Sequence, residues 1–224
     1  MSLTLKEVME ELKHQGTSQN VKVYRRHGAR GDLYGVSFAN LKALKKKIKI
    51  DQALAESLWE TGNIDARMLA TMVADPKNIT PETAEKWMKD IDYYVLADSF
   101  AGLIARTNMA RDKIMTWVKS GDEYVRQAGY STLASALKEG AGLSDEDCLD
   151  MLQRIEREIH SSPNRARHAM NNAVIAIGVF RPELSEQAVS AATGIGRVEV
   201  DHGDTSCKTP DAVSYIYKAL KRRM

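Results

Sequence analysis

The sequence of 224 residues predicts an all-α protein, an α-solenoid of stacked helix pairs. Apolar residues recur at helical spacing along most of the chain, and proline and glycine occur singly where these patterns end. Stacked helix pairs bury a continuous core and expose one concave face. We therefore expect a single domain over residues 1–224. Three apolar runs follow a polar turn and carry an arginine near their start: Asp65-Ala66-Arg67-Met68-Leu69-Ala70, Glu123-Tyr124-Val125-Arg126-Gln127-Ala128 and Asn164-Arg165-Ala166-Arg167-His168-Ala169.

The N-terminal half is expected to begin with an amphipathic helix over residues 3–14. Residues 28–37 are rich in glycine and predict a turn, and the stretch around Arg25 and Arg26 is expected to be loop. Ser37 can cap a helix that starts near Phe38. Further helices are expected at 51–60, at 65–73, from Pro81 behind a Thr80 cap, and at 93–104.

The C-terminal half continues this pattern with one exception. Helices are expected at 111–119, 123–137, 144–159, 165–179, 183–193 and 211–223. The spacing from Ser144 to Asp147 predicts a capping box. Residues 197–203 alternate apolar and charged side chains, so we expect a short β-prone segment there that ends at a turn.

Composition bounds the class of protein. The chain is 43% hydrophobic and has no apolar run of the roughly 18 residues that a membrane span needs. No membrane partner is therefore expected. Two cysteines, Cys148 and Cys207, are too few for a disulfide framework, which favours a cytoplasmic location. The three tryptophans, Trp59, Trp87 and Trp117, stand among apolar neighbours and are expected in the core.

Charge is unevenly distributed although the net charge is only +2. Residues 1–50 contain 11 Lys or Arg against 4 Asp or Glu, and residues 215–224 contain four cations and no acid. Such basic ends can attract a polyanion that the acidic middle repels. Candidate phosphate-binding residues are Arg25, Arg26, Lys45 and Lys46, and the helical arginines Arg126 and Arg167. A solvated helix face is the alternative interpretation of the lysines.

The segment from Asp92 to Phe100 holds the most informative polar pair. Tyr94 and Asp98 are four residues apart, so they share a face of the expected helix. A carboxylate in an apolar helix is costly unless it is paired or used in chemistry. It is either bonded to a neighbouring helix or lies on the floor of a concave groove. Arg126 could be its structural partner or a phosphate clamp.

Other chemistries find little support. Asp201-His202-Gly203-Asp204 and Cys207 lie close in sequence, but their spacing matches no standard metal site, so no metal and no cofactor are expected. A turn that leads into the last helix is the alternative. The sequence has no P-loop, nucleophile elbow, HExxH or paired CxxC motif, which leaves nucleotide and serine hydrolysis without a basis.

An ordered series of segments spans the chain: Tyr34-Gly35-Val36, Leu41-Lys42-Ala43-Leu44, Leu58-Trp59-Glu60, Ala66-Arg67-Met68-Leu69-Ala70, Tyr94 with Asp98, Arg126, and Arg167-His168-Ala169-Met170-Asn171. Through this series the chain resembles, across its whole length, the HEAT-like repeat DNA alkylation repair family, the alkylpurine DNA glycosylases. The resemblance implies a HEAT-like solenoid whose basic groove binds duplex DNA and excises cationic purines such as 3-methyladenine and 7-methylguanine. It implies that Asp98 stabilises the oxocarbenium-like sugar, that Tyr94 lines the site and that Arg126 contacts the DNA backbone.

Two positions depart from the pattern of the active family members. Tyr94 stands where they have a tryptophan, and Asn172 or a neighbour stands where a second tryptophan faces the lesion. Three hypotheses follow from these observations: a DNA glycosylase, an inactive or weakly active protein that binds damaged or branched DNA, and a HEAT-type protein scaffold. The partner expected from the first two is duplex DNA, alkylated or branched, and a monomer is expected.

Overall fold

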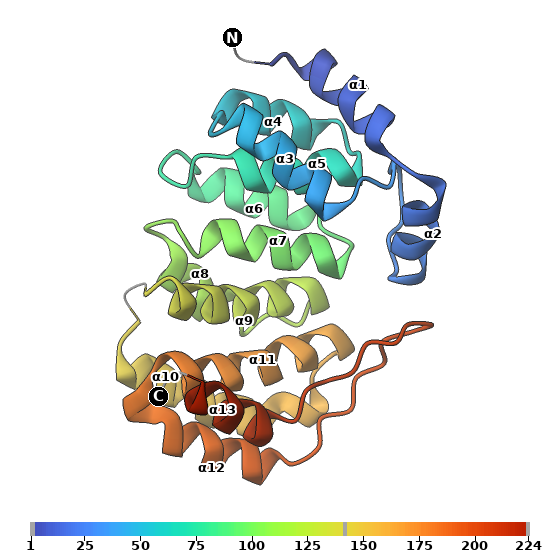
Figure 1. Ribbon diagram of the computed structural model, residues 1–224. Helices are drawn as coiled ribbons and strands as arrows, with labels where there is room; N and C mark the ends of the chain where they lie inside the picture. Colours follow the sequence, from blue (N-terminus) through green and yellow to red (C-terminus); the bar gives the residue numbers. More distant parts are fainter. Residues whose placement is uncertain (1–2, 141–142, 223–224) are drawn as a thin grey trace. The chain divides into compact units, whose positions relative to one another are not determined.

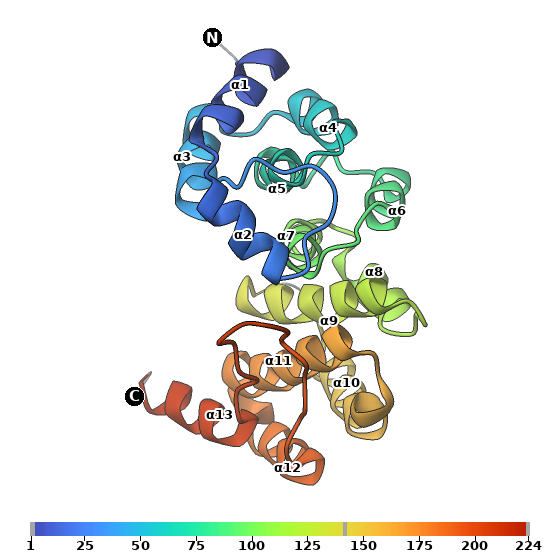
Figure 2. The same ribbon diagram turned by 90° about the vertical axis from the view of Figure 1, so that its right-hand side faces the viewer.

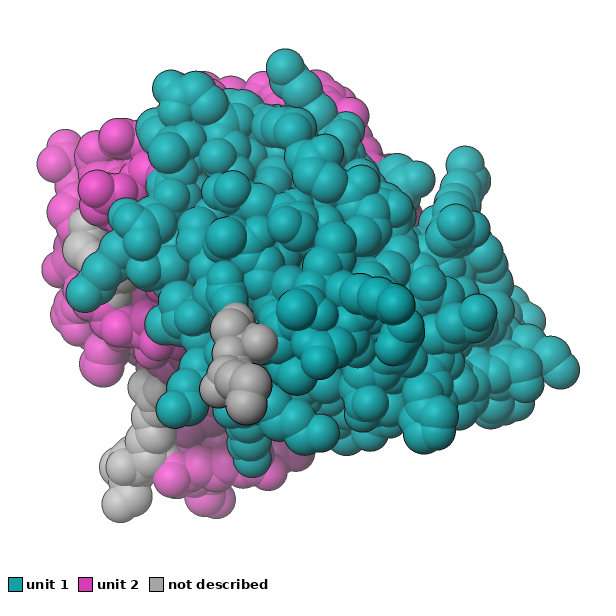
Figure 3. Space-filling view, turned by 90° about the horizontal axis from the view of Figure 1, so that it is seen from above, with its two compact units in different colours: residues 1–103, 203–205 teal, residues 104–202, 206–224 magenta. Residues whose placement is uncertain are grey.

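Helices account for the regular structure of the residues that the computed structural model describes, 3–140 and 143–222 (Figure 1). This described part contains thirteen α-helices and two short 3-10 helices. It confirms the all-α prediction, and most of the expected helix ends are correct within about two residues. The chain divides into two compact units, coloured separately in Figure 3: residues 1–103 with 203–205, and residues 104–202 with 206–224.

The first unit is organised around α5, which packs against α3 and α4. Its helices are α1 (Leu5–Gln15), α2 (Ser18–Arg26), α3 (Phe38–Ile48), α4 (Gln52–Glu60), α5 (Ile64–Val73), α6 (Pro81–Lys89) and α7 (Tyr94–Ile104), which ends at the boundary of the unit. The predicted caps are present, since Ser37 accepts a hydrogen bond from the N–H of Asn40 and Thr80 accepts one from the N–H of Thr83.

Aromatic stacking joins three helices in the core of this unit. The rings of Trp59 on α4 and Trp87 on α6 are parallel, with centroids 4.2 Å apart, and Phe100 of α7 lies tilted against both. All three side chains are almost completely buried, as is Trp117 in the second unit. The prediction that the tryptophans lie in the core is confirmed. Stacked aromatic pairs contribute more than their buried area alone.

Helix α2 is a correction to the sequence-based interpretation, which expected loop around Arg25 and Arg26. Both arginines lie in the last turn of this helix, which Thr17 caps by accepting a hydrogen bond from the N–H of Asn20. None of the residues of α2 is fully buried. Only three of its nine residues, Val21, Val23 and Tyr24, are apolar, so the sequence carried little of the apolar pattern on which the prediction depended.

A buried carboxylate holds the segment between α2 and α3. Asp65, in the first turn of α5 and 1% exposed, accepts hydrogen bonds from the backbone N–H groups of Tyr34 (2.6 Å), Gly35 (3.0 Å) and Val36 (2.9 Å). Gly35 has φ +79°, and a Cβ there would lie 2.5 Å from the carbonyl oxygen of Thr17. Burial raises the pKa of Asp65, and the three N–H groups oppose this shift.

The second unit is built around α11 (Asn164–Phe180). The other helices are α8 (Ala110–Trp117), α9 (Glu123–Lys138), α10 (Asp145–Glu158), α12 (Ser185–Ile195) and α13 (Ala212–Lys221). Helix α11 packs against α9, α10, α12 and α13, and Figures 1 and 2 both show it running between α9 and α12. Ser144 and Asp147 form the predicted capping box at the start of α10. Cys148 is buried on this helix.

The prediction of a β-prone C-terminal segment is wrong, because no strand occurs in the described part of the chain. Residues 197–210 have no regular secondary structure and bend at 204–206, and the backbone of Asp201 and Pro210 bonds to side chains of α11. Asn164 donates to the carbonyl of Asp201 and accepts from its N–H, both at 2.7 Å, and Asn171 donates to the carbonyl of Pro210 at 3.0 Å. Side-chain amides thus replace a partner strand. Cys207, on the same segment, is exposed.

Candidate nucleic-acid interface

Tyr94 and Asp98 occupy the same face of α7, one turn apart, as predicted from their spacing. Tyr94 is the first residue of the helix, and its hydroxyl lies 2.6 Å from Nδ1 of His27, which ends α2. Its ring meets that of Tyr93 edge to face at 5.6 Å. Asp98 is exposed. An aromatic ring held by a hydrogen bond therefore lies beside a carboxylate that solvent and ligands can reach.

His27 is the member of this group that the sequence did not identify. It is 67 residues from Tyr94 in the chain, and only the fold brings the imidazole and the hydroxyl together. The bond connects α2 to the start of α7, so the position of the Tyr94 ring depends on a helix that the sequence analysis did not expect.

The two arginines at the end of α2 make different contacts. The guanidinium of Arg25 donates to the carbonyl of Ala29 at 2.9 Å and to that of Gly31 at 2.6 Å, which orders the following turn. Arg26 and Arg30 are exposed on either side of this turn. Arg25 therefore shapes the basic turn from within, whereas Arg26 presents its charge to solvent.

Helix α3 carries three exposed cations, Lys42, Lys45 and Lys46, and Lys49 follows directly after its end; we call these four residues the lysine stripe. Lys42, Lys45 and Lys46 are spaced by three and four residues, so they lie on one side of the helix, next to the face that buries Leu41 and Leu44. All four are exposed, and α3 contains no acidic residue. Lysines in the last turn also complement the helix dipole. Since no carboxylate of the same helix neutralises it, the stripe is a strong local source of positive potential.

The three arginines of the recurrent sequence pattern share one structural position, the fourth residue of α5, α9 and α11. In two of them the Nε donates to a carbonyl at or after the end of the preceding helix: Arg67 to Trp59 at 3.2 Å and Arg126 to Ser120 at 2.6 Å. Arg126 also donates to the hydroxyl of Ser162 at 3.0 Å. The pattern therefore joins consecutive helices within each unit, and any contact of Arg126 with DNA would use its remaining N–H groups.

Arg167, the third of these residues, does not make the same hydrogen bond through its Nε. Its buried Nε has no hydrogen-bond partner in the described part of the structure. The next residue, His168, is largely buried, and its ring meets that of His202 edge to face at 5.3 Å. Burial, with contributions from His202 and Arg165, lowers the pKa of His168 to about 4. The start of α11 thus combines fixed cations with an imidazole that stays neutral near pH 7.

Among the described residues, no group of three or more His, Cys, Asp or Glu side chains is arranged to hold a metal ion. Asp201, His202, Asp204 and Cys207, which lie close in sequence, therefore do not form such a group. His202 instead lies 3.0 Å from the hydroxyl of Thr209, through Nε2. None of the described helices is long and apolar enough to cross a membrane.

The chain is similar to known proteins over nearly its whole length. Residues 8–216 match the family described as DNA alkylation repair enzyme. The chain is 30% identical to the uncharacterized protein Lin0241 of Listeria innocua and to the uncharacterized protein Lmo0209 of Listeria monocytogenes, with 98% of this chain and 99% of each relative covered. A solved structure superimposes with a TM-score of 0.89 at 34% identity and covers 99% of this chain and 95% of its own. It is described as a new family of proteins related to the HEAT-like repeat DNA glycosylases with affinity for branched DNA structures.

Proposed function

Because the chain belongs to the DNA alkylation repair family, we propose that it is a DNA-binding repair protein that prefers branched DNA to continuous duplex. The similar solved structure, whose description includes affinity for branched DNA structures, supports this preference. The observation on this chain that carries the proposal is the lysine stripe of α3, exposed and without an acid on the same helix.

The physical basis is the release of counterions. A duplex carries one phosphate charge per ~1.7 Å of its axis, and each phosphate that a lysine neutralises frees condensed cations into solution. Lysines spaced along one side of a helix can meet successive phosphates of a strand. Such contacts position the DNA without reading its sequence. Selectivity for a branch then comes from the shape of the DNA.

Replacing Lys45 and Lys46 together with glutamate is expected to weaken DNA binding at least tenfold. Each lost phosphate contact removes about one unit from the slope of log Kd against log salt concentration, so the slope should decrease by about two. Fluorescence anisotropy with a labelled three-way junction, measured from 50 to 300 mM NaCl, gives both quantities.

The matched control exchanges two exposed lysines on other parts of the first unit, Lys77 and Lys89, for glutamate. This control has the same net charge as the first variant and should keep nearly the wild-type slope. Equal losses in both variants would mean that net charge alone acts, and that α3 is not the contact surface. Wild-type protein without salt-sensitive binding to any DNA would favour a protein scaffold instead.

Base excision is the second candidate function, and the exposed carboxylate of Asp98 beside Tyr94 favours it. A cationic alkylated purine is already a good leaving group, so its excision needs mainly a negative charge near the developing oxocarbenium ion. Asp98 can supply that charge, and the ring of Tyr94, held by His27, can pack against the sugar. Arg126 and Arg167 are then assigned to the DNA backbone.

If the protein excises 3-methyladenine or 7-methylguanine from methylated duplex DNA, Asp98→Asn is expected to lower the rate roughly 100-fold. Junction affinity should change little, because the variant removes no cation, and thermal stability is measured alongside. The released bases are quantified by chromatography under single-turnover conditions. Loss of folding stability in Asp98→Asn would instead identify a structural carboxylate. No release by the wild type, together with intact junction binding, would leave branched-DNA recognition as the function.

A further inference from the structure

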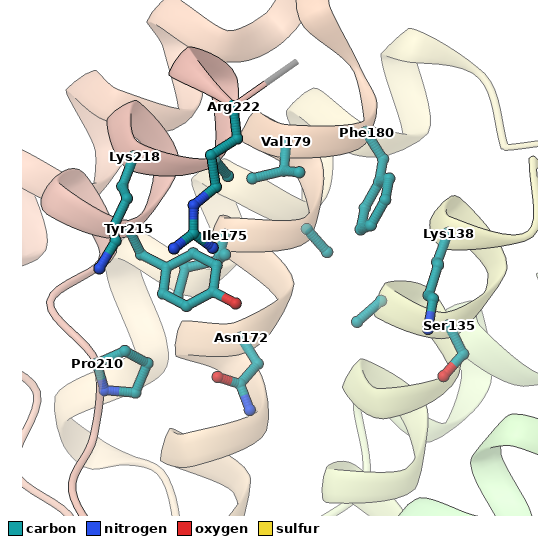
Figure 4. A pocket seen from close by; sticks show the side chains of 13 residues that line it. Ser135, Lys138, Asn172, Ile175, Val179, Phe180, Pro210, Tyr215, Lys218 and Arg222 are labelled. Carbon is teal, nitrogen blue, oxygen red and sulfur yellow. The ribbon is translucent and has the colours of Figure 1, made fainter.

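A cavity of about 640 Å³ opens in the second unit, between α9, α11 and α13 (Figure 4). Its volume lies within the ~300–1,000 Å³ typical of small-molecule sites. The floor is apolar and comes from α11, through Ile175, Ala176 and Val179. None of the thirteen residues that line the cavity is acidic. No motif in the sequence indicated this site, because its walls come from three separate helices.

Helix α13 has two faces that explain how the cavity wall is built. Ala212 and Ile216 are buried, and Ile216 reaches Gly178 of α11, where an added Cβ would lie 2.8 Å from its Cδ1. The neighbouring face presents Tyr215, Lys218 and Arg222 to the cavity. The glycine thus lets α13 sit close against α11, which holds the aromatic and cationic side chains in place.

The lining combines three kinds of group. Tyr215 is 51% exposed and offers a flat ring at the rim. Lys218 and Arg222 stand on the α13 wall and Lys138 on the α9 wall, so cations flank the opening on both sides (Figure 4). Asn172, half-buried on α11, supplies both a hydrogen-bond donor and an acceptor. A ring, an apolar floor, an amide and cations are the groups that recognise a nucleobase with its phosphate.

We propose that this cavity binds one unpaired nucleotide of a DNA strand, with its base against Tyr215 and its phosphates against Lys218, Arg222 and Lys138. The proposal rests on the proposed function and deepens it, because branched DNA exposes unpaired nucleotides that a continuous duplex does not. It also gives a role to Asn172, which by the family resemblance stands at or next to the position of a tryptophan in active members and which lines this cavity.

The test compares two labelled three-way junctions that differ only in two unpaired nucleotides at the branch point. Wild-type protein is expected to bind the junction with unpaired nucleotides about tenfold more tightly, a difference that one base–aromatic stack can supply. Tyr215→Ala and Lys218→Ala should abolish this preference and leave the affinity for the fully paired junction unchanged. Tyr215→Phe keeps the ring and should keep the preference.

Helix α13 provides matched controls, since Tyr217 is 59% exposed and neither Tyr217 nor Lys221 lines the cavity. Tyr217→Ala and Lys221→Ala should behave as wild type. If Tyr215→Ala keeps the preference, the cavity is not the site. If wild type binds both junctions equally, the nucleotide proposal fails and the proposed function survives, whereas no binding to either junction defeats both. Deoxyadenosine monophosphate serves as competitor, and if it binds more tightly than the junction, the cavity takes free nucleotides instead.

Discussion

Asp65→Ala is expected to lower the free energy of unfolding by about 3–4 kcal/mol. The substitution removes the acceptor of three backbone N–H groups, those of Tyr34, Gly35 and Val36, of which the last two bonds are buried. A buried donor left without a partner costs about 1–3 kcal/mol, and the three losses will not add fully because the segment can relax toward water. Urea denaturation followed by circular dichroism gives the change.

Asp32→Ala is the matched control, because Asp32 is exposed on the same segment, and it should cost less than about 0.5 kcal/mol. Asp65→Asn should fall between the two, since its amide keeps one acceptor oxygen but turns an NH₂ group toward donors. A loss below about 1 kcal/mol in Asp65→Ala would show that the carboxylate does not hold the segment. The segment leads directly into Ser37 and α3, so a true loss should also weaken junction binding through the lysine stripe.

The second large effect is a dependence of stability on pH that originates at His168. Its pKa is lowered from 6.5 to about 4 in the folded protein, mainly by burial. The unfolded chain therefore binds this proton at a higher pH than the folded chain does. The contribution of neutral His168 to the free energy of unfolding is fully present above pH 6.5 and is lost progressively as the pH falls to about 4. We expect a loss of about 2–3 kcal/mol over this range, reduced from the full linkage value because the ring is partly exposed.

His168→Gln isolates this contribution, because the variant cannot gain the proton. Unfolding free energies of both proteins, measured in urea between pH 7.5 and 4.5, should converge as the pH falls, since only the wild type loses stability through this group. His202, whose ring faces the same imidazole and whose pKa is also lowered by burial, remains in both proteins. Parallel curves would place the source of any acid sensitivity elsewhere.

Much of the helical architecture follows from local sequence signals. The caps at Ser37, Thr80 and Ser144 are hydrogen bonds between residues three positions apart, and the sequence predicts them correctly. The shared face of Tyr94 and Asp98 follows from helical periodicity in the same way. Helix α2 was missed because few of its residues are apolar. The prediction of a β-prone segment was wrong because an alternation of apolar and charged residues does not show whether a partner strand exists.

The parts of the site that could not be predicted depend on contacts between distant residues. His27 meets Tyr94, and Asp65 meets Gly35, only after several helices have folded. The cavity beside Tyr215 needs Gly178 to admit Ile216, which no single stretch of sequence reveals. Arg126, a phosphate-binding candidate in the sequence, donates to the carbonyl of Ser120, as Arg67 at the same helical position donates to those of Trp59 and Asp90. Sequence patterns identify the charges, and the fold decides which of them remain available to a ligand.

The contrast between the two cysteines makes the unmodified protein suitable for site-selective labelling. The thiol of Cys148 is buried on α10, and burial raises its pKa, so a maleimide reacts slowly there. Cys207 is exposed, three residues before Pro210 at the edge of the cavity. A single environment-sensitive dye can therefore be attached at this position without mutagenesis. Its emission would report on residues 197–210 and on the neighbouring cavity while DNA is added.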